Sequence, residues 1–164
     1  MEDTGHIPVL PKEVLTVLQP QKGNVIVDLT AGRGGHAIAL AMQAGEGSSV
    51  VLFDVDKDNL RFATQRLVST GVHVHPVHAN FATAATILKD LKLRADCVLA
   101  DLGFASNQMD DMSRGLSFMG DGPLDMRLNP ESSTTAADII QTTPENALAD
   151  LICHLGEEPY SRRI

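Results

Sequence analysis

The sequence has few aromatic residues and few cysteines. Only 4% of its 164 residues are aromatic, with one Tyr and no Trp, so the core of this domain-sized chain must be mainly aliphatic. The two cysteines, Cys97 and Cys153, lie far apart and follow no metal-ligand spacing. We expect free thiols that pack as small buried side chains in a reducing compartment, and therefore a cytoplasmic protein.

Long apolar runs and an excess of positive charge are also missing. No apolar run reaches the length of a membrane span, and the first residues lack the charged-then-apolar pattern of a secretory signal, so we expect no membrane partner. The 13 Lys and Arg are outnumbered by 21 Asp and Glu, for a net charge of −8. This balance argues against a general nucleic-acid-binding surface but leaves room for a local basic patch.

What the sequence does contain is a regular alternation of strand-like and helix-like segments. Four apolar runs are expected to form strands, at residues 24–30, 49–54, 72–78 and 95–102. The first three are each followed by a segment with the apolar spacing of a helix, at residues 35–44, 57–69 and 82–92. Such alternation predicts an α/β fold of the Rossmann-like type, with a mainly parallel sheet, helices on both faces, and ligands bound beyond the carboxyl ends of the strands.

The character of the chain changes after Gly103. Residues 104–135 are rich in Asp, Ser, Gly, Pro and Met, and predict a long loop, which in a compact domain is usually functional. Helices are expected at residues 136–142 and 145–155, the second with Pro144 at its start and Gly156 at its end. The change in character indicates that a ligand-binding domain precedes this stretch, which is either a long loop or the entry to an inserted subdomain.

A glycine loop follows the first predicted strand, in the sequence Asp28-Leu-Thr-Ala-Gly-Arg-Gly-Gly-His36. Its glycines allow a tight turn and close approach of a ligand to the start of the next helix. Dinucleotide-binding loops read G-x-G-x-x-G, whereas this loop reads G-x-G-G and is preceded by Asp28, which would repel a pyrophosphate. The loop favours the cationic donor S-adenosylmethionine over NAD; an NAD-dependent oxidoreductase and a turn without ligand remain the alternatives.

Three further side chains fall at the carboxyl ends of predicted strands. Asp54 is placed to accept hydrogen bonds from ribose hydroxyls, whereas Asp56 and Asp58 are expected at a helix N-terminus. Phe81 could cover an adenine ring or belong to the core. Asp101 could accept an N–H of an attacking amine or contact the amino-acid end of the donor. The six histidines form no metal-ligand pattern, so we expect no metal.

In order along the chain, these motifs resemble those of the bacterial small-subunit (16S) ribosomal RNA cytosine-N4 methyltransferases of the RsmH/MraW type. Residues 6–10 match an N-terminal H-x-P-V segment, residues 28–36 the donor loop, and residues 53–56 the strand that binds the ribose. Residues 101–110 match a D-L-G-x-S-S-x-Q-L-D stretch, and residues 114–118 with 121–127 match a two-part signature. Residues 156–164 match the opening of a helix. The signature Asp121-Gly-Pro-Leu-Asp-Met-Arg127 is the most specific of them. Phe104, Ala105 and Asn107 depart from the family's usual aliphatic residue, Ser and Pro.

The resemblance implies a Rossmann-like S-adenosylmethionine-dependent methyltransferase whose substrate is a cytidine in small-subunit ribosomal RNA, free or in the assembled subunit. It implies a methyl-donor-binding domain at residues 1–106 and the start of an inserted, mainly helical substrate-recognition subdomain at residues 107–164, and it makes Asp101 the candidate catalytic residue. Donor contacts are implied for Gly34, Gly35, His36, Asp54, Phe81, Asp101 and Gln108. Because net charge is negative, RNA contacts are expected to be local, with Arg33, Arg114, Arg127, Arg162 and Arg163 as candidates.

Members of this family continue well beyond the equivalent of Ile164, so the chain resembles their N-terminal portion only. A non-catalytic, donor-binding fragment of such an enzyme is therefore the alternative to a complete methyltransferase. A parallel sheet that stops at its fourth strand exposes an edge and apolar surface. We expect homo-oligomerisation or added partner strands to cover them.

Overall fold

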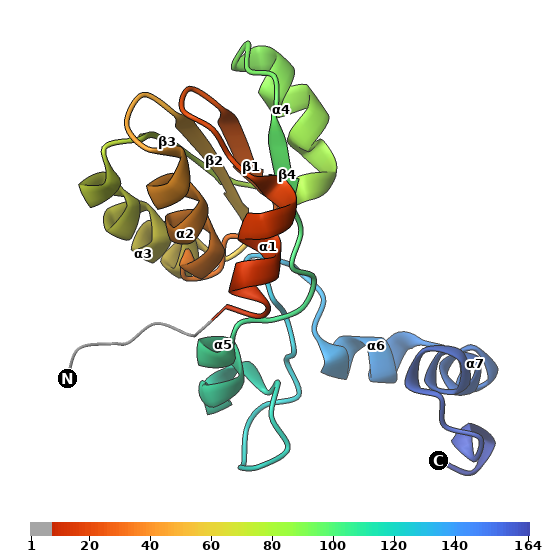
Figure 1. The fold of residues 1–164 in the computed structure, drawn as a ribbon. Helices are drawn as coiled ribbons and strands as arrows, with labels where there is room; N and C mark the ends of the chain where they lie inside the picture. Colours follow the sequence, from red (N-terminus) through yellow and green to blue (C-terminus); the bar gives the residue numbers. More distant parts are fainter. Residues whose placement is uncertain (1–7) are drawn as a thin grey trace. The chain divides into compact units, whose positions relative to one another are not determined.

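The computed structural model describes residues 8–164, which form two compact units divided between Gln108 and Met109 (Figure 1). The first two residues of the N-terminal segment at residues 6–10, His6 and Ile7, lie outside the described residues. No helix of the described part is long and apolar enough to cross a bilayer.

The first unit is built on a parallel sheet of four strands. The strands are β1 (Val25–Asp28), β2 (Ser49–Asp54), β3 (His73–His78) and β4 (Cys97–Leu99), in the order β3-β2-β1-β4. Every neighbouring pair runs parallel, with Val27 opposite Val51 on β2 and Val98 on β4. The predicted parallel α/β architecture is confirmed, and all four strands direct their carboxyl ends to one edge of the sheet.

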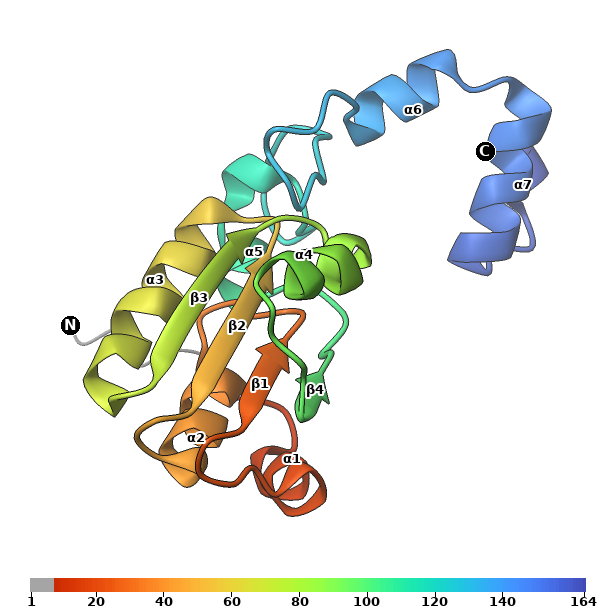
Figure 2. The ribbon, with the colours of Figure 1, turned by 90° about the horizontal axis from the view of Figure 1, so that it is seen from above.

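Helices cover both faces of this sheet (Figure 2). Because successive strand residues point to opposite faces, Ile26, Val50 and Leu52 pack on one side with α1 (Pro11–Leu18), α2 (Gly35–Ala44) and α3 (Lys57–Leu67). Val27, Val51 and Phe53 pack on the other side with α4 (Ala84–Asp90). The core is aliphatic apart from Phe53, as the scarcity of aromatic residues predicts.

The predicted element boundaries hold for most of the first unit. α2 and β2 have the predicted bounds, α3 continues into a 3-10 turn at Val68–Thr70, and α4 follows a 3-10 turn at Phe81–Thr83. The two-turn helix α1 was not predicted; its Val14, Leu15 and Leu18 pack against the core. The buried thiol of Cys97 agrees with expectation, and burial raises its pKa, but Cys153 is exposed, contrary to expectation.

The fourth strand is shorter than the sequence predicts. It ends at Leu99, so residues 100–102 are not strand and Asp101 lies two residues beyond the ladder. The Asp101 amide donates to the Thr30 hydroxyl (2.7 Å between N and Oγ1), so this amide is bonded to a side chain rather than to the backbone of a neighbouring strand. Among the described residues β4 pairs with β1 alone and Val98 is 51% exposed. Coverage of this edge by a second copy or by further strands stays a prediction.

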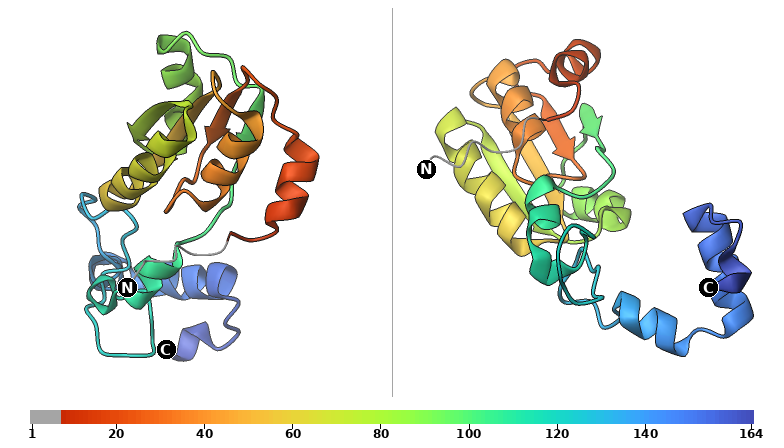
Figure 3. Two further views of the ribbon diagram at one scale, coloured as in Figure 1. Left: turned by 60° about the vertical axis from the view of Figure 1, so that its left-hand side comes forward. Right: turned by 90° about the horizontal axis from the view of Figure 1, so that it is seen from below.

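The second unit is mainly a long, ordered loop followed by helices (Figure 3). The short helix α5 (Ser106–Asp110) spans the boundary between the units, and a 3-10 turn at Met112–Arg114 follows it. α6 (Ala136–Thr142) has the predicted bounds and begins with a capping box between Thr135 and Asp138. α7 (Glu145–Gly156) includes Gly156 rather than ending before it, and the left-handed cap is Glu157; a last 3-10 turn covers Ser161–Arg163.

Candidate functional site

The glycine loop joins β1 to α2 and lies tightly against α3. Gly34 has φ +80° and is the N-cap of α2, and a Cβ built on it would lie 3.0 Å from the Cβ and 3.1 Å from the Cα of Ala63. The Ala31 amide donates to the Phe53 carbonyl at 2.9 Å, which ties the loop to β2. Only glycine fits position 34 without strain, and the amides at the start of α2 have no side-chain cap.

Asp54, at the end of β2, holds the loop from the other side. Its Oδ2 accepts the Gly32 amide at 2.7 Å, and its Oδ1 accepts the Asp56 amide at 2.8 Å. Burial raises the pKa of Asp54, and these two backbone amides counteract part of that rise. The carboxylate is therefore oriented by the chain before any ligand arrives, with unused lone pairs available for hydroxyl donors.

Asp28, at the end of β1, is a buried carboxyl beneath the loop. Its side chain is 1% exposed, and its Oδ1 accepts the Thr30 amide at 3.1 Å. Burial raises the pKa of Asp28 to about 7, and the negative charges of Asp54 and Asp101 add to the rise. Carboxyl groups thus gather at the ends of β1, β2 and β4, a region that favours positive charge on a ligand.

His36 and Asp101 face each other across the loop. His36 is buried at the start of α2, and its Nε2 lies 3.7 Å from the Asp101 Oδ2. The Asp101 side chain is 48% exposed. Asp101 thus combines a backbone anchored on Thr30 with a carboxylate that a substrate can reach.

Phe81 and Gln108 differ in how much of each side chain is accessible. Phe81 is 42% exposed at the start of a 3-10 turn that Asn80 caps, so it is not an ordinary core residue. Gln108 is 4% exposed. Its Nε2 donates to the Asp56 Oδ2 at 3.1 Å, and its Oε1 accepts the Ala105 amide at 2.9 Å.

Two residues of this site carried no functional signal in the sequence. Thr30 joins the ends of two strands, because its amide binds Asp28 and its hydroxyl binds the Asp101 amide. Asp56 caps α3, as predicted, with its Oδ1 accepting the amides of Asp58 and Asn59, but its second oxygen binds Gln108. Within the described part of the chain, no group of three or more His, Cys, Asp or Glu could hold a metal ion.

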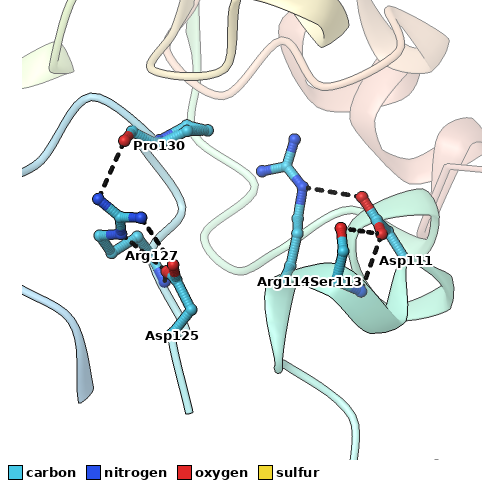
Figure 4. A pocket seen from close by; sticks show the side chains of 6 residues that line it. All are labelled: Asp111, Ser113, Arg114, Asp125, Arg127 and Pro130. Carbon is cyan, nitrogen blue, oxygen red and sulfur yellow. Dashed lines mark hydrogen bonds and ion pairs between the residues drawn. The ribbon is translucent and has the colours of Figure 1, made fainter. Parts of the chain in front are cut away.

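The distinctive stretch 121–127 lies in the second unit, beside a pocket of about 240 Å³ (Figure 4). Arg127 binds Asp125 through two hydrogen bonds, Nη2 to Oδ2 at 2.6 Å and Nε to Oδ1 at 2.8 Å. These bonds lower the pKa of Asp125 to about 2. The Nη1 of Arg127 donates to the carbonyl of Pro130 at 3.1 Å. The partners of Arg127 therefore lie in its own loop, which this side chain stabilises.

The other arginines predicted to contact RNA also have partners within the chain. The Arg33 guanidinium lies 3.8 Å from the centre of the Phe62 ring, and Arg163 lies 5.2 Å from that of Tyr160. Arg114 lies near Asp111, with 3.6 Å between Nε and Oδ2, and Arg162 binds Asp150 at 2.6 Å. Any RNA contact by these side chains would be made by groups that already have intramolecular contacts.

The model of the MraW methylase family matches residues 3–164 of this chain. Two relatives named ribosomal RNA small subunit methyltransferase H, from Citrifermentans bemidjiense and a Geobacter species, are 41% and 43% identical to it. Each alignment covers 100% of this chain and 53% of the relative, so the chain spans about half the length of the curated relatives it matches. Among solved structures it is similar to TrmN from Thermus thermophilus, with 21% identity and a TM-score of 0.46 over 72% of this chain and 36% of that one.

Proposed function

The chain belongs to the MraW methylase family, and we propose from this that its first unit binds S-adenosylmethionine. We further propose that, in a protein as long as its relatives, it serves the transfer of a methyl group to N4 of a cytidine in small-subunit ribosomal RNA. The chain spans about half of those relatives, and the part of the reaction that we assign to it is to bind the donor and to supply Asp101. A donor-binding unit without activity of its own is the alternative.

One observation carries the proposal: Asp28, Asp54 and Asp101 surround the glycine loop at the carboxyl edge of the sheet. A pyrophosphate brings two negative charges to such a loop, whereas S-adenosylmethionine brings a sulfonium and an ammonium group. Opposite charges within about 4–6 Å favour each other's charged forms. The acidic setting therefore supports a methyl donor over NAD, although both ligands have a ribose for Asp54.

The placement of each group supports the proposed donor contacts. The amides of Gly34 and Gly35 and the side chain of His36 lie at the N-terminus of α2, where a carboxylate is favoured. Asp54 is proposed to accept the ribose hydroxyls, and the exposed ring of Phe81 to lie against the adenine. Asp101 is proposed to face both the donor and the acceptor nitrogen.

The proposed role of Asp101 follows from the weak nucleophilicity of a cytosine amine, whose lone pair is delocalised into the ring. When bound, S-adenosylmethionine supplies a methyl group on a positively charged sulfur. The exposed carboxylate of Asp101 would accept one N–H of the amine and help the nitrogen become pyramidal while its lone pair forms the new N–C bond. The bond between the methyl group and sulfur would break at the same time, and its electron pair would stay on the sulfur, which becomes neutral. The same carboxylate can take the proton that the nitrogen releases.

Calorimetry with each candidate ligand tests the donor site. We expect S-adenosylmethionine to bind and NAD not to bind. Gly34→Ala should weaken donor binding at least about tenfold, since the new methyl group presses on Ala63 of α3 and displaces the loop. Gly45→Ala is the matched control: Gly45 has a similar φ of +77° but nothing within 4 Å of an added Cβ, so donor affinity should be unchanged. Binding of NAD in place of the donor would contradict the proposal.

Asp101→Asn tests the chemical step, in a protein extended to the length of the relatives and supplied with unmodified small ribosomal subunits. We expect turnover to fall by about a hundredfold or more, because the amide is a far weaker acceptor for the amine proton. Full turnover with unchanged donor affinity would exclude both roles given to Asp101. Methyl transfer by the extended protein but not by residues 1–164 alone would identify this chain as the donor-binding part.

A further inference from the structure

We propose that Thr30 is a positioning residue, whose hydroxyl holds the backbone at Asp101 and so sets where the Asp101 carboxylate lies beside the glycine loop. The inference rests on the proposed function, because the position of Asp101 matters for catalysis only if the chain serves methyl transfer. The resemblance to the family gives no role to Thr30 itself. The hydrogen bonds at the ends of β1 and β4 point to one.

The Thr30 hydroxyl takes the place of a backbone acceptor where the pairing of β1 with β4 ends. Asp28 lies opposite Leu99, and the Leu29 amide donates to the Leu99 carbonyl at 2.9 Å. Because the bonds of a parallel pair are evenly spaced, the next one would run from the Asp101 amide to the Leu29 carbonyl. The Asp101 amide instead donates to the Thr30 Oγ1 at 2.7 Å. A side chain therefore determines where this amide lies beyond the last bond of the sheet.

Thr30 is in turn held by Asp28, at the end of β1. The Thr30 amide donates to the Asp28 Oδ1 at 3.1 Å. Burial raises the pKa of Asp28, and hydrogen bonds from the amide and the hydroxyl of Thr30 oppose that rise. A hydroxyl can donate one hydrogen bond while it accepts another, so Thr30 can bind the Asp28 carboxyl and the Asp101 amide together. Because Asp28 is almost completely buried, this arrangement connects Asp101 to the interior of the sheet.

Packing offers little support to the segment that carries Asp101. Residues 100–104 are all exposed, and a Cβ built on Gly103 would have nothing within 4 Å. The Asp101 Oδ2 lies 3.7 Å from the His36 Nε2, which is longer than an ordinary hydrogen bond. The bond to the Thr30 hydroxyl is therefore expected to decide the position of Asp101 more than packing does.

Two substitutions at position 30 and one control test the attachment. Thr30→Val removes the acceptor with almost no change of shape, and Thr30→Ser keeps a hydroxyl on a smaller side chain. Thr64→Val is the matched control, since the Thr64 hydroxyl donates to the Leu60 carbonyl within α3 at 2.7 Å. In unliganded residues 1–164, the Asp101 amide should exchange at least about tenfold faster in Thr30→Val, but not in Thr30→Ser or Thr64→Val. Unchanged exchange in Thr30→Val would overturn the proposal.

Turnover and donor affinity separate positioning from a role in donor binding or in stability. In a protein extended to the length of the relatives, with unmodified small ribosomal subunits, Thr30→Val should lower kcat about tenfold or more, and Thr30→Ser should stay within about threefold. The affinity for S-adenosylmethionine should fall by no more than about threefold, because only one of the proposed donor contacts is disturbed. A loss confined to donor affinity, or a lower melting temperature with unchanged turnover, would contradict the positioning role.

A double variant shows whether Thr30 acts through Asp101. In the Asp101→Asn background, Thr30→Val should lower turnover by less than about threefold, since the carboxylate to be positioned is already gone. An equal loss with Asp and with Asn at position 101 would mean that the effect runs through Asp28 or through general stability, and the proposal would be wrong. Failure of the unmodified extended protein to transfer a methyl group would instead contradict the proposed function. Exchange of the Asp101 amide would still decide whether Thr30 holds it.

Discussion

Gly115→Ala is expected to destabilise the second unit by about 3 kcal/mol or more. Gly115 has φ +63°, and a Cβ at this position would overlap the carbonyl oxygen of Pro123 and lie 3.2 Å from the Asp125 amide nitrogen. Both obstacles are backbone atoms, so no rotation of a side chain can relieve them. Urea denaturation, with hydrogen exchange of residues 112–137 to locate the change, measures the effect.

Two other glycine-to-alanine substitutions serve as controls. They separate the steric overlap at Gly115 from the effects that replacing any glycine has on the backbone. Gly156→Ala lies in α7 of the same unit with no atom within 4 Å of the new Cβ, and should be neutral or slightly stabilising. Gly47→Ala combines φ +87° with open space, and should cost only about 1 kcal/mol of backbone strain. If Gly115→Ala lowers the free energy of unfolding no more than Gly47→Ala does, Gly115 does not pack against Pro123 as described.

The same packing gives a physical reason for the distinctive stretch 121–127. Its backbone runs between two other segments: the Met126 amide donates to the Arg114 carbonyl, and the Leu124 and Asp125 carbonyls accept the amides of Ala137 and Ala136. A Cβ at Gly122 would overlap the Met112 carbonyl. Gly115 and Gly122 leave room for the neighbouring backbone, and Arg127 closes the loop by binding Asp125. The signature is thus first of all an architectural feature.

The elements that the sequence predicts well are those specified by neighbouring residues. The helix at 35–44 has a glycine loop before it and Gly45 after it, and β2 is a continuous apolar run, so local pattern fixes both. The end of β4 is specified by a hydrogen bond to Thr30, a residue 71 positions away. No local pattern carries that information, so the strand was predicted too long.

The candidate site likewise has features that the sequence predicts and features that it does not. Parallel strands bring their carboxyl ends to one edge, so a shared location for Asp28, Asp54 and Asp101 follows from the strand pattern alone. The bond between Gln108 and Asp56 joins residues 52 positions apart, and nothing in the type of either residue indicates its partner. Arg127 is the opposite case, because its partner Asp125 is only two residues away. An RNA contact by Arg127 stays a prediction.

Asp28→Asn is expected to reduce the pH dependence of the first unit's stability between about pH 4 and pH 7. Burial raises the pKa of Asp28 to about 7 in the folded chain, whereas its ordinary value is 3.8. The folded state therefore binds more protons than the unfolded state in this range. The contribution of Asp28 to the free energy of unfolding is most favourable below about pH 4 and falls as pH rises to about 7, by at most about 4 kcal/mol.

Urea denaturation at a series of pH values measures this effect, with exchange of the β1 amides as a probe of the first unit. The asparagine keeps an oxygen to accept the Thr30 amide but cannot ionise, so the stability curve should flatten. Asp90→Asn, at the exposed end of α4, is the control and should keep the original slope. An equal slope in Asp28→Asn and the unmodified protein would show that Asp28 is not the group that titrates.

The same substitution should change the pH dependence of donor binding. A cationic donor beside Asp28 favours the carboxylate, so binding below about pH 7 must release the proton that Asp28 holds. S-adenosylmethionine affinity should therefore rise with pH up to about pH 7 and then level off, while Asp28→Asn should bind more weakly and with little change over this range. Calorimetry in two buffers of different ionisation enthalpy would count the released proton. A donor that binds Asp28→Asn as tightly as the unmodified protein at pH 8 would remove the charge argument for a sulfonium ligand.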